Sequence, residues 1–112
     1  MSVSCADGSD VSRSIDGSLT SFSSCARMWT GVLRDAVKIR QISLIYVKSF
    51  EKDIPKVIVG EEGKTMLSCT MERGTAMNDY QFLCYRWPSE KVEIELNGKV
   101  FDVKVYCKFY YF

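Results

Sequence analysis

Basic and aromatic side chains alternate near the end of the chain, in a pattern that could bind a polyanion. Alternate residues of an extended segment share one face, and here these are Lys104, Tyr106, Lys108 and Tyr110. Lysine contacts phosphate while tyrosine stacks on a base, which suits single-stranded DNA or RNA. A second basic group precedes a long apolar stretch and consists of Arg34, Lys38 and Arg40. Two other interpretations stay open, because the tyrosines could instead pack in the core or face a protein partner.

The composition argues against catalysis and against a bound metal. The chain contains no histidine, which removes the usual general base, the Ser-His and Cys-His nucleophilic sites and the imidazole metal ligands. The five cysteines include no Cys-x-x-Cys pair of the kind that holds zinc. We therefore predict a protein that is not an enzyme and that has no cofactor and no metal.

The cysteines also bear on the cellular compartment. They are Cys5, Cys25, Cys69, Cys84 and Cys107, an odd number. The first residues are acidic and serine-rich, unlike a signal peptide, and without an export signal reduced thiols are the default. We expect five free cysteines in an intracellular, reducing environment. The chain also has no apolar run of about 18 residues, so no membrane partner is expected.

The chain divides by composition into an arm and a domain. Residues 1–24 contain nine serines and few apolar side chains, so they cannot bury enough surface to offset the entropy of ordering. We predict a disordered, acidic, serine-rich arm there and a single β-rich domain over residues 25–112. At the boundary, Ser24 could cap one short helix, since apolar residues follow it at helical spacing.

Asn97-Gly98 is the strongest local signal for a β-hairpin, because both residues of a type I′ turn need a positive φ. A two-residue turn there would place Ile94 opposite Phe101 and align the apolar residues of both strands on one face. The residues predicted to form the core are Leu44, Leu67, Phe82, Val92, Ile94, Phe101, Val103 and Val105.

The remaining apolar runs predict further strands separated by turns. They lie near residues 37–47, 57–59, 65–71 and 80–87, and a change of phase at Arg40-Gln41 predicts a bulge in the first. Regularly spaced short strands with at most one short helix are typical of all-β folds. We predict a small antiparallel sandwich or barrel of five to six strands.

Two segments resemble small proteins of plant single-stranded DNA viruses. The first is the run Phe-Asp-Val-Lys-Val-Tyr-Cys-Lys-Phe from Phe101 to Phe109, and the second is the basic-to-hydrophobic strand from Lys38 to Val47. Together with the cysteine-containing, serine- and aspartate-bearing start of the chain, they are similar to the nuclear shuttle proteins of nanoviruses. The resemblance implies a viral, DNA-associated protein of the host cytoplasm and nucleus.

Two functional hypotheses follow from these patterns. The leading one is a non-enzymatic viral accessory protein that binds nucleic acid through the basic and tyrosine residues named above and helps to transport viral DNA. The alternative is an interaction module without nucleic-acid affinity, whose tyrosine-rich sheet surface binds a host or viral protein. The net charge of +1 favours the alternative, whereas the clustering of basic residues favours nucleic acid. The sequence does not exclude a homo-oligomer.

Overall fold

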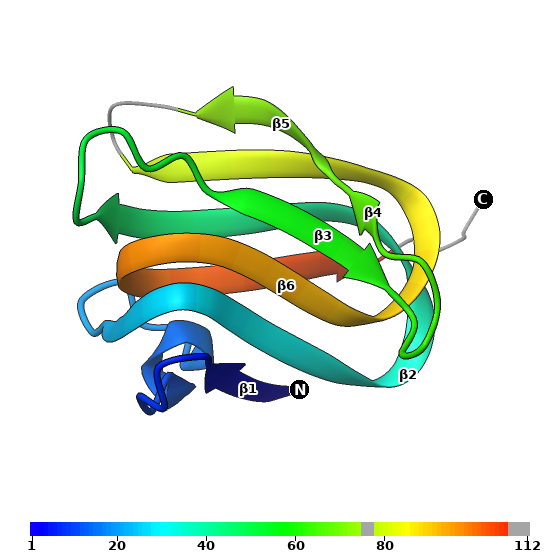
Figure 1. Cartoon of the computed structure of the whole chain (residues 1–112), viewed down its shortest axis with the longest axis horizontal. Coiled ribbons are helices and arrows are strands. Elements are labelled where there is room, and N and C mark those ends of the chain that lie inside the picture. Colours follow the sequence, from blue (N-terminus) through cyan, green and yellow to red (C-terminus); the bar gives the residue numbers. More distant parts are fainter. Residues whose placement is uncertain (75–77, 108–112) are drawn as a thin grey trace.

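The chain folds almost entirely into β-strands, which confirms the predicted all-β class. The computed structural model describes residues 1–74 and 78–107, and Figure 1 shows how its elements are arranged. In chain order these are β1 (Ser2–Cys5), the 3-10 helix η1 (Ser12–Ile15), β2 (Ser23–Lys48), β3 (Lys56–Gly60), β4 (Leu67–Ser68), β5 (Thr70–Gly74) and β6 (Asp79–Cys107).

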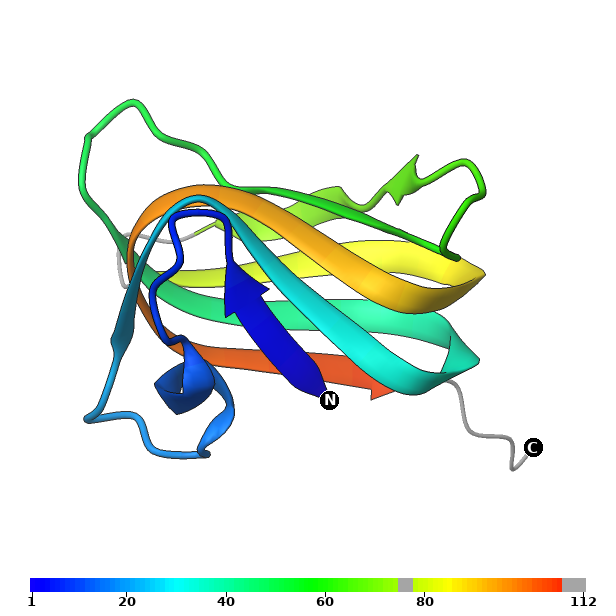
Figure 2. The ribbon, with the colours of Figure 1, turned by 60° about the horizontal axis from the view of Figure 1, so that its bottom comes forward.

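Two long strands, β2 and β6, build both layers of the fold. The strand order is β1-β2-β6-β3-β4, with β5 paired to β6, and the pairings are antiparallel. Residues 23–32 of β2 pair with residues 91–100 of β6, whereas residues 37–48 pair with residues 79–89 and 98–107. Each long strand therefore bends and passes from one layer to the other, and the sheet curls into the sandwich seen in Figure 2.

The space between the layers is filled by alternating apolar residues of the long strands. Of the predicted core residues, those that are buried are Leu44, Phe82, Val92, Ile94 and Val103. Phe101 and Val105 are half-buried. The prediction is wrong for Leu67, which is 39% exposed because it lies on the two-residue strand β4 at the end of the sheet.

The hairpin predicted at Asn97-Gly98 is wrong. Residues 91–100 pair with the first part of β2, and residues 98–107 pair with its last part, so the two flanks of Asn97-Gly98 do not pair with each other. β6 instead continues through Asn97-Gly98 and crosses the end of β2 closely. A Cβ atom on Gly98 would lie 2.1 Å from the main-chain oxygen of Val47. Glycine is therefore required here by the close approach of two backbones.

The bulge predicted at Arg40-Gln41 is confirmed. On β2, the paired positions Ile39 and Gln41 are two residues apart. Their partners on the last part of β6, Cys107 and Tyr106, are adjacent. Arg40 is therefore the extra residue of a β-bulge, and its side chain is exposed.

The first 24 residues differ from the disordered arm that the sequence predicts. β1 pairs with β2, and η1 packs against β6. A hydrogen bond also joins η1 to β2: the indole N–H of buried Trp29 donates to the Ser14 hydroxyl at 2.9 Å, and Ser14 donates to the carbonyl of Val11. A few buried contacts thus order a polar segment. The helix expected after Ser24 is also wrong, because residues 23–48 form β2.

Disulfides replace most of the predicted free thiols. Cys5 is bonded to Cys25, and Cys69 is bonded to Cys84. Cys107 carries a free thiol. The prediction of five free cysteines is therefore wrong, because sequence separations of 20 and 15 residues do not reveal which strands become neighbours.

Among residues 1–74 and 78–107, no helix has the length and apolar character needed to cross a membrane. Within the same residues, no group of three or more His, Cys, Asp or Glu side chains could hold a metal ion.

Candidate binding site

A cavity of about 300 Å³ opens between the start of β2, the loop that follows β2 and the point where β6 crosses them. Its lining residues are Asp7, Ser24, Cys25, Ala26, Ser49, Phe50, Asn97, Gly98 and Lys99. The lining residues thus include side chains with carboxylate, hydroxyl, amide and ammonium groups and one aromatic ring. A small number of placed polar groups beside an apolar surface is typical of a small-molecule site.

A second cavity, of about 250 Å³, lies between β3 and β5 beside the second disulfide. Its lining residues are Ile54, Pro55, Lys56, Val57, Ser68, Cys69, Met71 and Phe82. Most of these side chains are apolar and offer few hydrogen-bonding groups. The cavity at Phe50 is therefore the better candidate for specific recognition.

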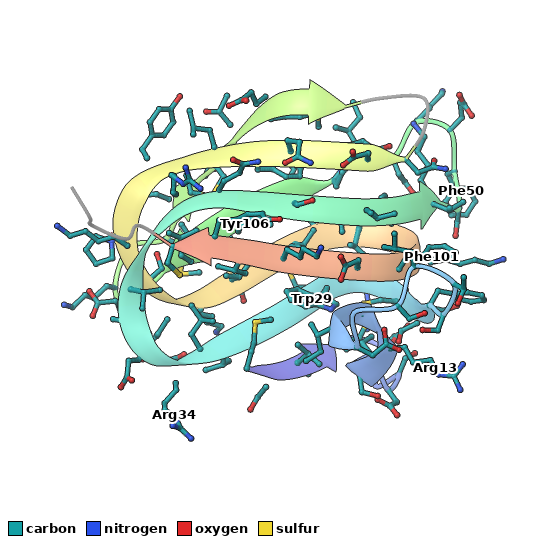
Figure 3. The ribbon with its side chains drawn as sticks, turned by 180° about the vertical axis from the view of Figure 1, so that it is seen from behind. Arg13, Trp29, Arg34, Phe50, Phe101 and Tyr106 are labelled. Carbon is teal, nitrogen blue, oxygen red and sulfur yellow. A yellow bond between two sulfur atoms is a disulfide. The ribbon has the colours of Figure 1, made fainter. Side chains whose placement is uncertain are left out.

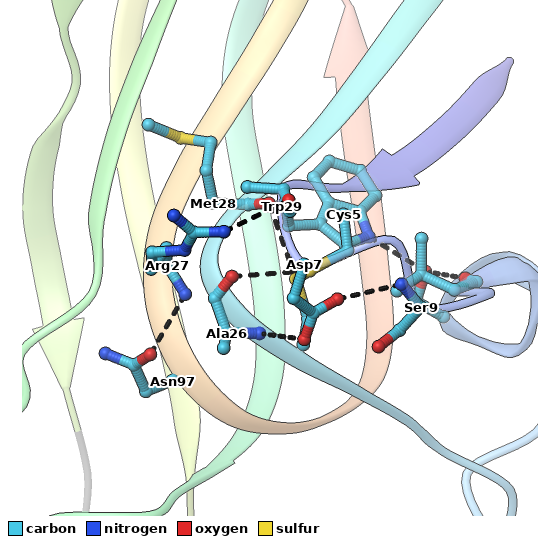
Figure 4. The surroundings of a disulfide bond; sticks show 12 residues. Cys5, Asp7, Ser9, Ala26, Arg27, Met28, Trp29 and Asn97 are labelled. Carbon is cyan, nitrogen blue, oxygen red and sulfur yellow. Dashed lines mark hydrogen bonds between the residues drawn. A yellow bond between two sulfur atoms is a disulfide. The ribbon is translucent and has the colours of Figure 1, made fainter.

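Asp7 is fixed at the cavity by main-chain hydrogen bonds, as Figure 4 shows. One carboxylate oxygen accepts the N–H of Ser9 at 2.8 Å, and the other accepts the N–H of Ala26 at 3.0 Å. Hydrogen bonds from Ser9, and then from Ala26, lower the pKa of the Asp7 carboxyl below its ordinary value of 3.8. Asp7 therefore presents a carboxylate at neutral pH. The disulfide between Cys5 and Cys25 ties its loop to β2.

Arg27, next to the cavity residue Ala26, has an unusual backbone conformation and hydrogen-bonds to two other segments of the chain. Its φ of 73° lies in the left-handed region, which is uncommon for residues other than glycine. Its N–H donates to the side-chain oxygen of Asn97 at 2.9 Å, and its guanidinium donates to the carbonyl of Ala6 at 3.2 Å. The consecutive amides of Ala26 and Arg27 thus position two side chains of the cavity, Asp7 and Asn97. Such backbone strain clusters at binding sites.

Tyr46 supports the floor of the cavity from the core. Its hydroxyl donates to the carbonyl of Asn97 at 2.8 Å and accepts the N–H of the same residue at 3.0 Å. The N–H of Ser49 donates to that carbonyl as well, at 2.8 Å. Burial raises the pKa of Tyr46, so the hydroxyl keeps its proton at neutral pH. Phe50, which follows Ser49, is 65% exposed and offers its ring to a ligand.

The residues predicted to bind nucleic acid lie outside this cavity. Arg34, Lys38 and Arg40 are exposed at and after the bend of β2, and Lys104 and Tyr106 are exposed on the last part of β6. Arg40 immediately precedes the residue that pairs with Tyr106. Arg34 instead lies at the corner of the molecule, away from Tyr106, as Figure 3 shows. The structure thus brings part of the predicted set together and leaves Arg34 apart.

One lysine of this predicted surface lies beside a carboxylate. The ammonium of Lys104 lies 3.8 Å from the carboxylate of Asp102, which offsets its positive charge. Lys108 and Tyr110 lie outside the described residues. The nucleic-acid assignment of these residues stays a prediction.

Sequence reasoning missed nearly all of the cavity. Asn97 draws attention in the sequence, but as a turn residue, and Asp7 lies in the segment predicted to be disordered. The lone aromatic residue of the polar stretch 49–53 is the one signal that could have indicated Phe50. The others are ordinary polar residues that only the crossing of β6 over β2 brings together.

Comparison with known proteins identifies the fold and no family. No family model matches the chain, and no curated protein matches it. A family 89 glycoside hydrolase from Clostridium perfringens matches with a TM-score of 0.73 and 14% identity over 96% of this chain. The match spans 14% of that enzyme's chain. A variant of the same enzyme, TM-score 0.72, is in complex with its substrate GlcNAc-α-1,4-galactose.

Two further structures match over nearly their whole length. The F5/8 type C domain of a Bacteroides fragilis protein has a TM-score of 0.66 and 16% identity, covering 97% of this chain and 92% of that one. The lectin domain of lectinolysin, complexed with Lewis B antigen, has a TM-score of 0.66 and 17% identity, covering 96% and 92%. At such identities the likeness establishes the fold alone. The resemblance to nanovirus proteins stays a prediction that no family match supports.

Proposed function

We propose that this protein is a carbohydrate-binding module and that the cavity at Phe50 takes one sugar ring. The observation that carries the proposal is the exposed Phe50 ring beside fixed polar groups in one small cavity. Sugars need both kinds of contact, because their hydroxyl groups form hydrogen bonds while their C–H groups pack on the negative face of an aromatic ring. The fold shared with an F5/8 type C domain and a lectin domain supports the same function.

Each group in the cavity has a role in this proposal. Phe50 is the platform for the apolar face of the sugar. The Asp7 carboxylate, held by the main-chain N–H groups of Ser9 and Ala26, can also accept a sugar hydroxyl. Lys99, Ser24 and Ser49 supply donors. Because a carboxylate and an ammonium line the same cavity, a neutral sugar fits better than an acidic one.

A binding role without catalysis is part of the proposal. Glycoside hydrolysis usually requires a pair of carboxyl groups that flank the scissile bond. Asp7 is the one carboxylate among the residues that line the cavity. The nucleic-acid alternative has less support, because net charge is +1 and none of the solved structures named above is described as binding nucleic acid.

We also propose an oxidising compartment in place of the intracellular one expected from the sequence. Disulfides persist outside the cytosol and are rare within it, where thiols are kept reduced. The pairs Cys5–Cys25 and Cys69–Cys84 support this assignment.

The test is a titration of the oxidised protein followed by NMR, which detects weak binding. A glycan array is screened first. The probes for the titration are N-acetylglucosamine, galactose, fucose, GlcNAc-α-1,4-galactose, Lewis B antigen and any further glycan that binds on the array. We expect shifts in the amides of Ala26, Asn97 and Lys99. Phe50→Ala should weaken binding about tenfold or more, which corresponds to about 1.4 kcal/mol. The matched control is Tyr85→Ala, which removes a ring that is 67% exposed and does not line the cavity.

Two results would overturn the proposal. One is the absence of binding to every probe and to the array. The other is an equal effect of Phe50→Ala and Tyr85→Ala. Binding of single-stranded DNA that weakens with salt, and that the double variant Lys38→Ala with Arg40→Ala abolishes, would instead support the nucleic-acid hypothesis.

A further inference from the structure

The two strands that line the cavity continue past it on the same face. Ser24 pairs with Lys99, and both line the cavity. Alternate residues of a strand point to the same side. The next outward positions, two residues further along, are Phe22 and Phe101, and the residues between them and the cavity are buried.

A β-bulge lies at Phe101. Val100 and Asp102 pair with adjacent residues of β2, so Phe101 between them is the extra residue. The core position predicted for Phe101 depended on the hairpin, whereas in the uninterrupted strand Phe101 keeps the outward phase of Lys99, and the bulge shifts the phase so that Val103 is buried. The Phe101 ring packs against Phe22, with 5.3 Å between ring centroids. We name Phe22 and Phe101 the aromatic shelf.

Lys99 joins the cavity to the aromatic shelf. Lys99 lines the cavity, and its ammonium nitrogen lies 5.0 Å from the centroid of the Phe22 ring. Phe22 is 37% exposed, so part of its ring remains open to a ligand. Phe50 and Phe101 lie at the same end of the molecule, as Figure 3 shows.

We propose that the aromatic shelf is a second sugar subsite, so that the protein recognises an oligosaccharide rather than a single sugar. This inference rests on the proposed function. The cavity, at about 300 Å³, is at the small end of the range of about 300–1,000 Å³ for ligand sites, so it holds one ring. Any further sugar must lie outside it, and the shelf begins about 7 Å away along the strands.

The chemistry of the shelf fits a second sugar residue. The exposed part of the Phe22 ring offers an apolar platform, as Phe50 does in the cavity. Lys99 lies between the two platforms and can donate to oxygen atoms near the glycosidic linkage. Phe101 supports Phe22 from below, because its own ring is half-buried.

The experiment compares Phe22→Ala and Phe50→Ala on the probes defined above, measuring the dissociation constant of each monosaccharide and of the oligosaccharide that contains it. We expect Phe22→Ala to weaken oligosaccharide binding by about two- to tenfold, the size of an aromatic contact, and to leave monosaccharide binding unchanged. Phe50→Ala should weaken both. The control is Leu19→Ala, which removes an apolar side chain that is 60% exposed near the shelf in sequence, and should change neither.

The outcomes separate this inference from the proposed function. Equal losses of monosaccharide and oligosaccharide binding in Phe22→Ala would overturn the second subsite, as would unchanged oligosaccharide binding. Both results leave carbohydrate binding itself standing. If the wild-type protein binds no probe and no glycan on the array, the proposed function fails and the second subsite fails with it.

Discussion

Gly98→Ala tests whether β6 crosses β2 as closely as the structure shows. The added Cβ would lie 2.1 Å from the main-chain oxygen of Val47 and 3.0 Å from the Cα of Lys48. It would also lie 2.9 Å from the ring of Tyr46. Ordinary Cβ contacts begin near 3.4 Å. The nearest atom belongs to a backbone and cannot rotate away, so the two strands must move apart.

The expected loss of stability follows from these contacts. Overpacking costs about 1–3 kcal/mol and occasionally more, and a backbone clash of this size places Gly98→Ala at the upper end, about 3 kcal/mol. Separation of the strands would also weaken the two hydrogen bonds between the Tyr46 hydroxyl and Asn97, each worth about 1 kcal/mol. A total of about 3–5 kcal/mol is a large share of the stability of a domain of this size.

Urea unfolding followed by tryptophan fluorescence measures this loss. The control is Gly63→Ala, at a glycine with a φ of +78° and nothing within 4 Å of an added Cβ. Its cost comes from the left-handed backbone alone, about 1–2 kcal/mol. We expect Gly98→Ala to lower the unfolding free energy clearly more than Gly63→Ala does. Equal midpoints for the two variants, at equal slopes, would refute the close crossing and with it the floor of the cavity.

Thiol titration in denaturant without reductant should find one reactive cysteine, Cys107, and a count of five would show that the disulfides do not form. Reduction should lower the unfolding free energy by about 3 kcal/mol per disulfide, because each bond closes a loop of moderate length in the unfolded chain. Asp7 should make the stability of the folded protein fall at acid pH. Its native pKa is lowered, so its contribution is fully present above the ordinary value of 3.8 and is lost as the pH falls below it. The amide shift of Ala26 should therefore titrate with a midpoint below 3.8, and a midpoint at or above that value would contradict the hydrogen bonds to Asp7.

The strands from about residue 37 onward and much of the core could be predicted from the sequence because they depend on local alternation, whereas β1 and the first part of β2 were not predicted. Val92 and Ile94 are buried as predicted, and the change of phase at Arg40 correctly indicated a bulge. Phe101 is a residue for which the local sequence pattern predicted the wrong environment. A hairpin at Asn97-Gly98 would place it in the core, but β6 continues without a turn, so Phe101 shares the outward phase of Lys99 and packs against Phe22. Alternation reports which face a residue takes only while the ladder stays regular.

The sequence by itself determined that this is an all-β chain without histidine chemistry, because composition and period-two patterning are local properties. The tertiary structure decided which strands pair, which cysteines bond and where the cavity lies. Asn97-Gly98 makes the difference concrete. The dipeptide favours a hairpin locally, but the same glycine also permits two backbones to cross closely. The crossing lets β2 and β6 bury apolar side chains in both layers of the fold, and this tertiary packing outweighs the local preference for a turn. That crossing brings Asp7, Phe50 and Lys99 to one cavity, from positions that no local pattern connects.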